Sequence, residues 1–286
     1  MDIRVTQNFL HSSKLVSDLL DRTTVSNNDT VLEIGPGKGI ITRELAMRCK
    51  KLIAVEYDAR FVDSLQRSFE GCSNVKIVKS DILKINIRIG HDYKIFSNIP
   101  FNITADIMEK FLSDKELSEA YFIMQYEAFL KYAGQPYYNN SYKSILLKPF
   151  FDTEMLYRFK QSDFVPVPQA SIVLASFVRK KYADIASDSE NIYNDFVSYI
   201  YLQGGRTIAE KIIRIFTYNQ LKHIWGQLDA KKDDFISSMS YQDWLVLYKT
   251  FERFVAEDKK GFVRGQYLYL KHEQSKLQKI HRNRKA

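Results

Sequence analysis

Residues 30–42 read TVLEIGPGKGIIT, an apolar, partly β-branched run followed at once by three alternate glycines. The run Val31–Ile34 is typical of a buried strand, and Ile40–Arg48 has the spacing of an amphipathic helix. The glycines therefore occupy the turn from a strand into a helix. Glycine lets the backbone turn sharply there and approach a ligand without a Cβ in the way. This unit predicts an α/β fold with a cofactor site at the turn.

Alternation of short apolar runs with amphipathic segments continues to about residue 180 and predicts a doubly wound, Rossmann-like parallel sheet. The expected strands are Val31–Ile34, Leu52–Glu56, Val75–Lys79, Tyr93–Ser97, Ala120–Gln125, Phe150–Phe159 and Ser171–Arg179. The expected helices are Ile40–Arg48, Ala59–Phe69, Thr104–Leu112 and Glu127–Lys131. The segment KQSDFVPVPQA between the last two strands is too short for a crossover helix, so we expect the last strand to run antiparallel.

The sequence pattern changes after Lys181, where the stretches DSENIYNDFVSYIYLQ and QDWLVLYKTFERFVAE carry helical spacing without strand alternation. We therefore expect a catalytic domain over residues 1–181 and a small helical domain over residues 182–270. A tail over residues 271–286 holds six Lys or Arg residues against one acid, Glu273. It is either a solvated chain end or an arm that binds nucleic acid.

Composition indicates an ordinary globular protein, with 45% hydrophobic residues and a net charge of +8, which favours a polyanionic partner. Cys49 and Cys72 are the two cysteines, too few for a disulfide framework or a zinc motif, and the five histidines form no ligand cluster. No signal peptide or membrane-spanning stretch is evident. We expect a cytoplasmic protein that uses no metal, contacts no membrane and works as a monomer.

Two acids follow the next strands at positions where a nucleoside could be held. Glu56 ends the second strand and could accept hydrogen bonds from both ribose hydroxyls, whereas Asp81 follows the third and could accept from an adenine amine beside Ile82. The spacing G-x-G-x-G of Gly35, Gly37 and Gly39 differs from the dinucleotide pattern G-x-G-x-x-G. S-adenosylmethionine (SAM) has no pyrophosphate, so it needs close backbone approach more than an anion site. The order of features predicts SAM as the cofactor.

The fourth strand is followed by Asn98-Ile99-Pro100-Phe101. These residue types could bind both the edge and the face of a planar base. The Asn98 side-chain carbonyl and a backbone carbonyl of Ile99 or Pro100 could each accept one N–H of an adenine amine and aim its lone pair outward. The Phe101 face would stack on the ring. Taken alone, Asn-x-Pro is equally an ordinary turn signal, and a following Phe is usually a core residue.

These residues resemble the adenine-N6 rRNA dimethyltransferases, and among them the erythromycin-resistance (Erm) branch more than the housekeeping small-subunit branch. The resemblance begins at QNFL, passes through the glycine loop and SNIPFNIT, includes DFVPVPQASIVLASF and reaches IFTYNQLKHI in the helical part. It departs from the family at Phe101, where Tyr is frequent. Stacking survives that change, but a tyrosine hydroxyl is absent.

The resemblance implies roles for individual residues. It assigns to SAM binding Gln7, Asn8, Leu10, Gly35, Gly37, Glu56, Asp81, Ile82 and Asn98. It assigns to the target adenine Asn98, Ile99, Pro100, Phe101 and Phe164, the last of which would cover the second face of the flipped base. Residues alone leave open that Phe164 is a core aromatic before a Pro-rich turn and that Asn8 is an N-cap or loop residue.

The function implied is SAM-dependent N6-methylation, with dimethylation expected, of one adenosine in 23S rRNA at the macrolide-binding region. Resistance to macrolides, lincosamides and streptogramin B would follow. A housekeeping 16S rRNA adenine dimethyltransferase is the nearest alternative. A catalytically silent nucleic-acid-binding relative is an alternative of another class, and a dehydrogenase is more distant because it would leave Asp81 and Asn98–Phe101 without a role.

Overall fold

A computed structural model describes residues 8–87 and 89–276, which form two compact units. The first unit holds the described residues up to Leu130 together with Phe151–Lys181, and the second holds Lys131–Phe150 and the described residues from Tyr182 onward. The expected domain over residues 1–181 is therefore wrong for residues 131–150. Ile145 is fully buried in the apolar cluster of the second unit, where its carbonyl accepts a hydrogen bond from the Tyr193 hydroxyl at 2.8 Å.

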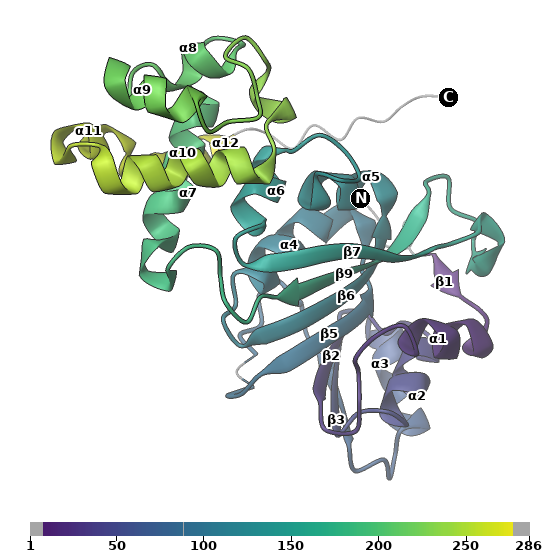
Figure 1. The fold of residues 1–286 in the computed structure, drawn as a ribbon. Helices are drawn as coiled ribbons and strands as arrows, with labels where there is room; N and C mark the ends of the chain where they lie inside the picture. Colours follow the sequence, from purple (N-terminus) through teal and green to yellow (C-terminus); the bar gives the residue numbers. More distant parts are fainter. Residues whose placement is uncertain (1–7, 88, 277–286) are drawn as a thin grey trace. The chain divides into compact units, whose positions relative to one another are not determined.

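The first unit contains a seven-stranded sheet in the order β4-β3-β2-β5-β6-β9-β7 (Figure 1). The strands are β2 (Thr30–Ile34), β3 (Lys51–Glu56), β4 (Val75–Lys79), β5 (Tyr93–Asn98), β6 (Leu117–Gln125), β7 (Phe151–Arg158) and β9 (Ile172–Arg179). Neighbours from β4 to β6 pair parallel, whereas β9 pairs antiparallel with both β6 and β7. The predicted doubly wound sheet with an antiparallel last strand is confirmed.

Five helices belong wholly or mainly to this unit: α1 (Ser13–Leu20), α2 (Ile40–Ala46), α3 (Ala59–Ser68), α4 (Thr104–Leu112) and α5 (Tyr126–Ala133), the last of which crosses the unit boundary. The chain runs outward from β2 to β4 and then returns to place β5 beside β2. Right-handed crossovers put helices before and after this return on opposite faces of the sheet. The carboxyl ends of β2 and β5 therefore meet at the topological switch point, where open α/β sheets bind ligands.

A second, two-stranded sheet fastens the start of the described chain to a distant segment. Here β1 (Phe9–Leu10) pairs antiparallel with β8 (Phe164–Val165), with Leu10 opposite Phe164. Both of these residues are buried in an apolar cluster that also includes Val16 of α1 and Val31 of β2. Burial of this cluster holds β1 beside the glycine loop, although the two are separated by more than 20 residues of sequence.

The second unit is helical, as predicted. Its α-helices are α6 (Tyr142–Leu147), α7 (Glu190–Leu202), α8 (Ile208–Ile212), α9 (Tyr218–Trp225), α10 (Tyr241–Phe254), α11 (Glu257–Val263) and α12 (Gln266–Lys276). The part of the chain that the structure describes also holds short 3-10 turns at Phe101–Ile103, Gln161–Asp163, Ser187–Ser189 and Ile236–Ser238. The core of the second unit is aromatic, with Phe196 and Phe251 centroids 4.7 Å apart beside the fully buried Trp244.

Among the residues that the structure describes, no helix is both long and apolar enough to cross a bilayer.

Candidate functional site

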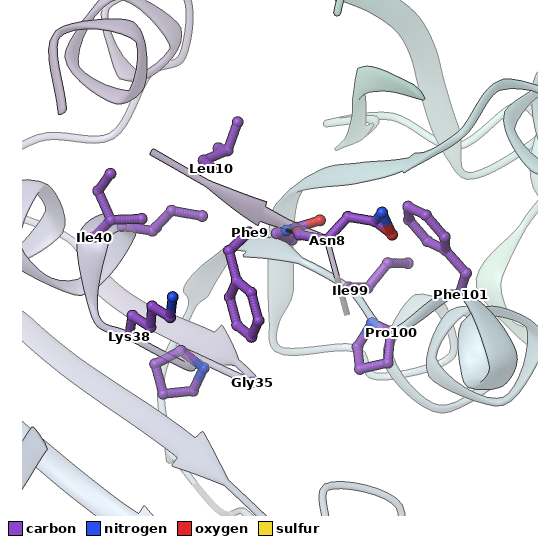
Figure 2. A pocket seen from close by; sticks show the side chains of 12 residues that line it. Asn8, Phe9, Leu10, Gly35, Lys38, Ile40, Ile99, Pro100 and Phe101 are labelled. Carbon is purple, nitrogen blue, oxygen red and sulfur yellow. Dashed lines mark hydrogen bonds between the residues drawn. The ribbon is translucent and has the colours of Figure 1, made fainter. Parts of the chain in front are cut away.

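Two pockets of the first unit share Gly35 and Pro100 as lining residues and lie at the carboxyl ends of β2 to β5. The first, which we call the loop pocket (Figure 2), is lined by Asn8, Phe9, Leu10, Gly35, Pro36, Lys38, Ile40, Ile41, Asn98, Ile99, Pro100 and Phe101. The second, which we call the acid pocket, has a volume of about 230 Å³ and is lined by Ile34, Gly35, Val55, Glu56, Tyr57, Asp58, Ser80, Asp81, Ile82, Leu83, Pro100, Asn102 and Ile103.

The glycine loop has a backbone that other residues would strain. Gly37 has φ +54, and a Cβ at this position would lie 2.6 Å from Cε1 of the Phe9 ring. Gly35, at φ +65, would place a Cβ 3.9 Å from the Pro100 ring. The missing Cβ at Gly37 therefore lets β1 approach the glycine loop closely, whereas at Gly35 the positive φ is what favours glycine.

Glu56 is held rigidly at the wall of the acid pocket. Its side chain is only 2% exposed, and both carboxylate oxygens accept backbone hydrogen bonds. Oε2 accepts from the Gly37 N–H at 3.0 Å, and Oε1 accepts from the Asp58 N–H at 2.8 Å. Each carboxylate oxygen can accept more than one hydrogen bond, so the group retains capacity for a vicinal pair of hydroxyls.

Glu33, on the neighbouring strand β2, is a second buried acid near the glycine loop. Burial raises the pKa of Glu33 to about 8, although the hydroxyl of Thr42 opposes the rise and the nearby Glu56 adds to it. Glu33 lines neither pocket. At neutral pH it is therefore protonated, which removes a negative charge that would otherwise repel Glu56.

Asp81 and Ile82 also lie where the sequence predicts, on the acid pocket. Asp81 Oδ1 accepts a hydrogen bond from the Leu83 N–H at 2.9 Å, and its Oδ2 lies 3.8 Å from the Lys84 ammonium. The loop after β4 is thus a compact turn organised by the Asp81 side chain, with Ile82 buried to 5% exposure.

The side-chain amide of Asn98 has a defined orientation. Its Nδ2 donates to the backbone carbonyl of Asn8 at 2.8 Å. A carbonyl only accepts, so the nitrogen must face Asn8 and Oδ1 must face away. Within the described part of the chain, neither Oδ1 of Asn98 nor the carbonyl of Ile99 accepts a hydrogen bond, whereas the Pro100 carbonyl accepts one from the Ile103 N–H at 3.2 Å. Two acceptors, one residue apart, are thus available.

The β1 strand completes the loop pocket. Asn8 donates from Nδ2 to the Pro166 carbonyl at 3.1 Å, which ties β1 to the Pro-rich turn, and Leu10 is buried at 5% exposure. In Figure 2, Phe9 stands between Lys38 on one side and the Ile99-Pro100 segment on the other. Gln7, the remaining residue expected here, lies outside the described residues.

The two aromatic residues expected to clamp a base have different environments. Phe101 is half-buried and lines the loop pocket. Phe164 is 1% exposed, lines neither pocket, and packs its ring 5.1 Å from that of Phe159. In this structure the Phe164 ring therefore lies in the core and not on the loop pocket, and its expected role of covering a base stays a prediction. Pairing of β8 with β1 turns the Phe164 side chain into the apolar cluster beneath α1.

Several further lining residues carry no motif of their own in the sequence. Phe9 contacts the glycine loop, and its ring lies 5.3 Å from the Lys38 ammonium and 5.8 Å from the ring of Phe61. Tyr57 is 62% exposed directly after Glu56, and Asn102 follows Phe101. Their only sequence signal is that each neighbours a predicted site residue. Among the described residues, no group of three or more His, Cys, Asp or Glu side chains could hold a metal ion.

Comparison with known proteins gives concordant matches. Residues 2–253 match the family model described as Ribosomal RNA adenine dimethylase. The chain is 28% identical over 255 residues to the rRNA adenine N-6-methyltransferase of Bacillus anthracis, covering 88% of each chain. It is 26% identical over 254 residues to the Ribosomal RNA small subunit methyltransferase A of Fusobacterium nucleatum subsp. nucleatum, covering 86% of this chain and 96% of the relative. The crystal structure of the 23S rRNA methyltransferase ErmE shares the fold, with a TM-score of 0.79 at 22% identity, covering 86% of this chain and all of that one (100%).

Proposed function

The chain belongs to the ribosomal RNA adenine dimethylase family, and from this premise we propose that it uses SAM to methylate N6 of one adenosine in 23S rRNA. The observation that carries the proposal is the orientation of Asn98. Its amide nitrogen is occupied by the Asn8 carbonyl, so its carbonyl oxygen is the group left to meet an exocyclic amine. Dimethylation of that adenosine, and macrolide resistance as its consequence, are part of the same proposal.

The acid pocket fits the adenosine end of SAM better than a dinucleotide. Three carboxylates line it (Glu56, Asp58 and Asp81), and among the described residues no Lys, Arg or His does. Such a wall accepts hydrogen bonds from ribose hydroxyls and from an adenine amine but repels a phosphate group. This argues against the dehydrogenase alternative, whose cofactor carries a pyrophosphate.

In the proposed mechanism, SAM would supply a sulfonium-bound methyl group, to whose carbon an amine nitrogen can bond while the S–C bond breaks and the thioether leaves. The loop pocket then has to present that amine. Oδ1 of Asn98 and the Ile99 carbonyl each accept one N–H, which draws the nitrogen lone pair out of conjugation and aims it at the methyl carbon. Pro100 keeps the segment before it extended, so both acceptors are in place before the base arrives. After transfer the amine proton passes to solvent.

The target adenosine has to leave its stacked context to reach this pocket. Phe101 lines the loop pocket and offers an aromatic face that a flipped base can stack on. With Phe164 buried in the core, Phe101 carries the stacking role by itself in this proposal.

Replacement of Phe101 by alanine is expected to weaken productive RNA binding by about 1–3 kcal/mol, the range of one lost base–aromatic stack. Phe101→Tyr is the matched control, because it keeps the ring, and it should retain activity. Steady-state kinetics with saturating SAM and varied RNA would show the effect as a higher KM for RNA. A variant Phe101→Ala with unchanged KM and kcat would exclude stacking.

The choice of RNA is the point at which two candidates differ. Likeness to the Erm branch in the segment IFTYNQLKHI and in the motifs around Asn98 favours 23S rRNA. A role in small-subunit biogenesis is the second candidate, favoured by the relative from Fusobacterium nucleatum. Protein-free 23S rRNA, protein-free 16S rRNA and 30S subunits should be incubated separately with labelled SAM, and the modified base mapped by reverse transcription.

Labelling of 23S rRNA alone supports the proposal. Labelling of 16S rRNA alone, free or in 30S subunits, would show that the protein performs the same reaction in small-subunit biogenesis. No label in any RNA, with SAM bound, would favour a silent RNA-binding relative. Expression in a macrolide-sensitive bacterium should raise the tolerated macrolide concentration only in the first case.

The basic tail is proposed to bind RNA phosphates without reading bases. Residues 277–286 lie outside the described residues, and α12 ends at Lys276. Replacing all six cations of residues 271–286 by glutamine should flatten the plot of log K for RNA binding against log salt concentration, by up to about 0.7–0.9 for each phosphate that the tail neutralises. Substitution preserves the length of α12, which a deletion would not. An unaltered slope would show that the tail takes no part.

A further inference from the structure

Lys110, in the last turn of α4, reaches across to the loop that follows β4. Its ammonium donates to the Ile82 carbonyl at 2.6 Å and to the Ile85 carbonyl at 2.5 Å. These bonds hold the carboxyl-terminal side of the turn that Asp81 organises from its other side through the Leu83 N–H. This turn is therefore held twice, once by its own acid and once by a cation from another element.

The environment of Lys110 separates it from an ordinary surface lysine. Burial lowers the pKa of its ammonium, and the carboxylate of Asp81 opposes that change. Among the described residues no carboxylate lies within ion-pair distance of Lys110, so its charge is directed at two neutral carbonyls.

The two elements that Lys110 joins are two walls of one pocket. The loop after β4 supplies Asp81, Ile82 and Leu83 to the acid pocket. The turn that leads into α4 supplies Asn102 and Ile103 to the same pocket. An ammonium fixed to α4 and bonded to the loop thus sets the distance between these walls.

Other lysines, which line neither pocket, make similar bonds. Lys148 donates to the Gln135 carbonyl and Lys211 to the Gln203 carbonyl, both within the second unit. Hydrogen bonds from a lysine ammonium to backbone carbonyls are therefore a common way to fasten a loop. Lys110 differs in that the loop it fastens lines the acid pocket.

We propose that Lys110 is a positioning residue that fixes the adenine-side wall of the acid pocket and thereby sets affinity for the adenosine portion of the cofactor. This inference rests on the proposed function only in taking SAM as the ligand of the acid pocket. Lys110 itself touches neither cofactor nor RNA and acts through the loop that it fastens.

The test compares Lys110→Met, which keeps the length of the side chain and removes the donors, with Lys110→Arg, which keeps donors. Lys84→Met is the matched control, because Lys84 lies in the same loop but its side chain is 85% exposed. Calorimetry with SAM and with adenosine alone is expected to show affinity lowered about tenfold or more in Lys110→Met for both ligands. Lys84→Met should change affinity less than about twofold, and Lys110→Arg should recover part of the loss.

Turnover distinguishes positioning from a general loss of structure. In Lys110→Met, KM for SAM should rise while kcat at saturating SAM and KM for RNA stay near the parent values. Equal affinity of parent and Lys110→Met for SAM and adenosine would overturn the inference, as would a lower melting temperature and kcat with unchanged affinity. If the parent protein bound no SAM at all, the proposed function itself would fail, which is a separate result.

Discussion

Asn98→Ala is expected to reduce kcat by about one and a half to three orders of magnitude, corresponding to about 2–4 kcal/mol of lost transition-state stabilisation. The side chain is positioned before substrate arrives, because its Nδ2 is already bonded to the Asn8 carbonyl at 2.8 Å. A preorganised acceptor costs no reorganisation at the moment of reaction, which is why its removal is expected to appear in kcat. Single-turnover methylation with preformed enzyme–SAM complex is the suitable measurement.

Asn98→Asp provides the sharper control. A carboxylate is a stronger acceptor than an amide, so a simple acceptor role would leave this variant active. In the structure, however, one carboxylate oxygen would face the Asn8 carbonyl, and two acceptors repel. We therefore expect Asn98→Asp to be impaired nearly as much as Asn98→Ala. Turnover of the alanine variant within about threefold of the parent, with SAM still bound, would remove Asn98 from the mechanism.

The positions of the strands along the sequence were predictable, because each buried parallel strand is a short apolar run between amphipathic segments. Val75–Lys79 and Thr104–Leu112 match β4 and α4 at both ends. Helix α1 was missed, although Ser12 caps its first turn and Val16, Leu19 and Leu20 carry helical spacing. Only eight residues long, it follows two residues of strand and resembles a loop in a local window.

The contacts that could not be predicted from the sequence all join residues that are far apart along the chain. The bond between Asn98 and Asn8 joins residues 90 positions apart, and it orients the amide on which the proposed chemistry depends. Whether an aromatic before a Pro-rich turn faces a pocket or the core is also undecided locally, and the pairing of Leu10 with Phe164 decides it for the core. Likewise, residues 131–150 carry no local sign that Ile145 belongs to the core of the helical unit, whose other members lie beyond residue 181.

Glu56→Ala is expected to raise the dissociation constant for SAM by about one to two orders of magnitude. A hydrogen bond to a charged group contributes about 1.5–3 kcal/mol, and the ribose offers two donors. Isothermal titration calorimetry measures the change directly. With 2′-deoxyadenosine in place of adenosine as ligand, the parent should bind more weakly and the difference between parent and Glu56→Ala should shrink. A variant that binds SAM as tightly as the parent would exclude the ribose role.

Glu56→Gln, usually a conservative change, is expected to bind SAM nearly as poorly as Glu56→Ala. Both carboxylate oxygens accept a backbone N–H, from Gly37 at 3.0 Å and from Asp58 at 2.8 Å. A glutamine amide keeps one acceptor but turns an NH₂ group toward the second N–H, and two donors cannot satisfy each other. At a site only 2% exposed, water cannot readily replace the missing partner. Either the glycine loop shifts or one N–H stays unpaired, and both outcomes disturb the Gly37 backbone that the cofactor is proposed to approach. Full SAM affinity in Glu56→Gln would show instead that the loop tolerates an unpaired donor and that the charge of Glu56 is dispensable.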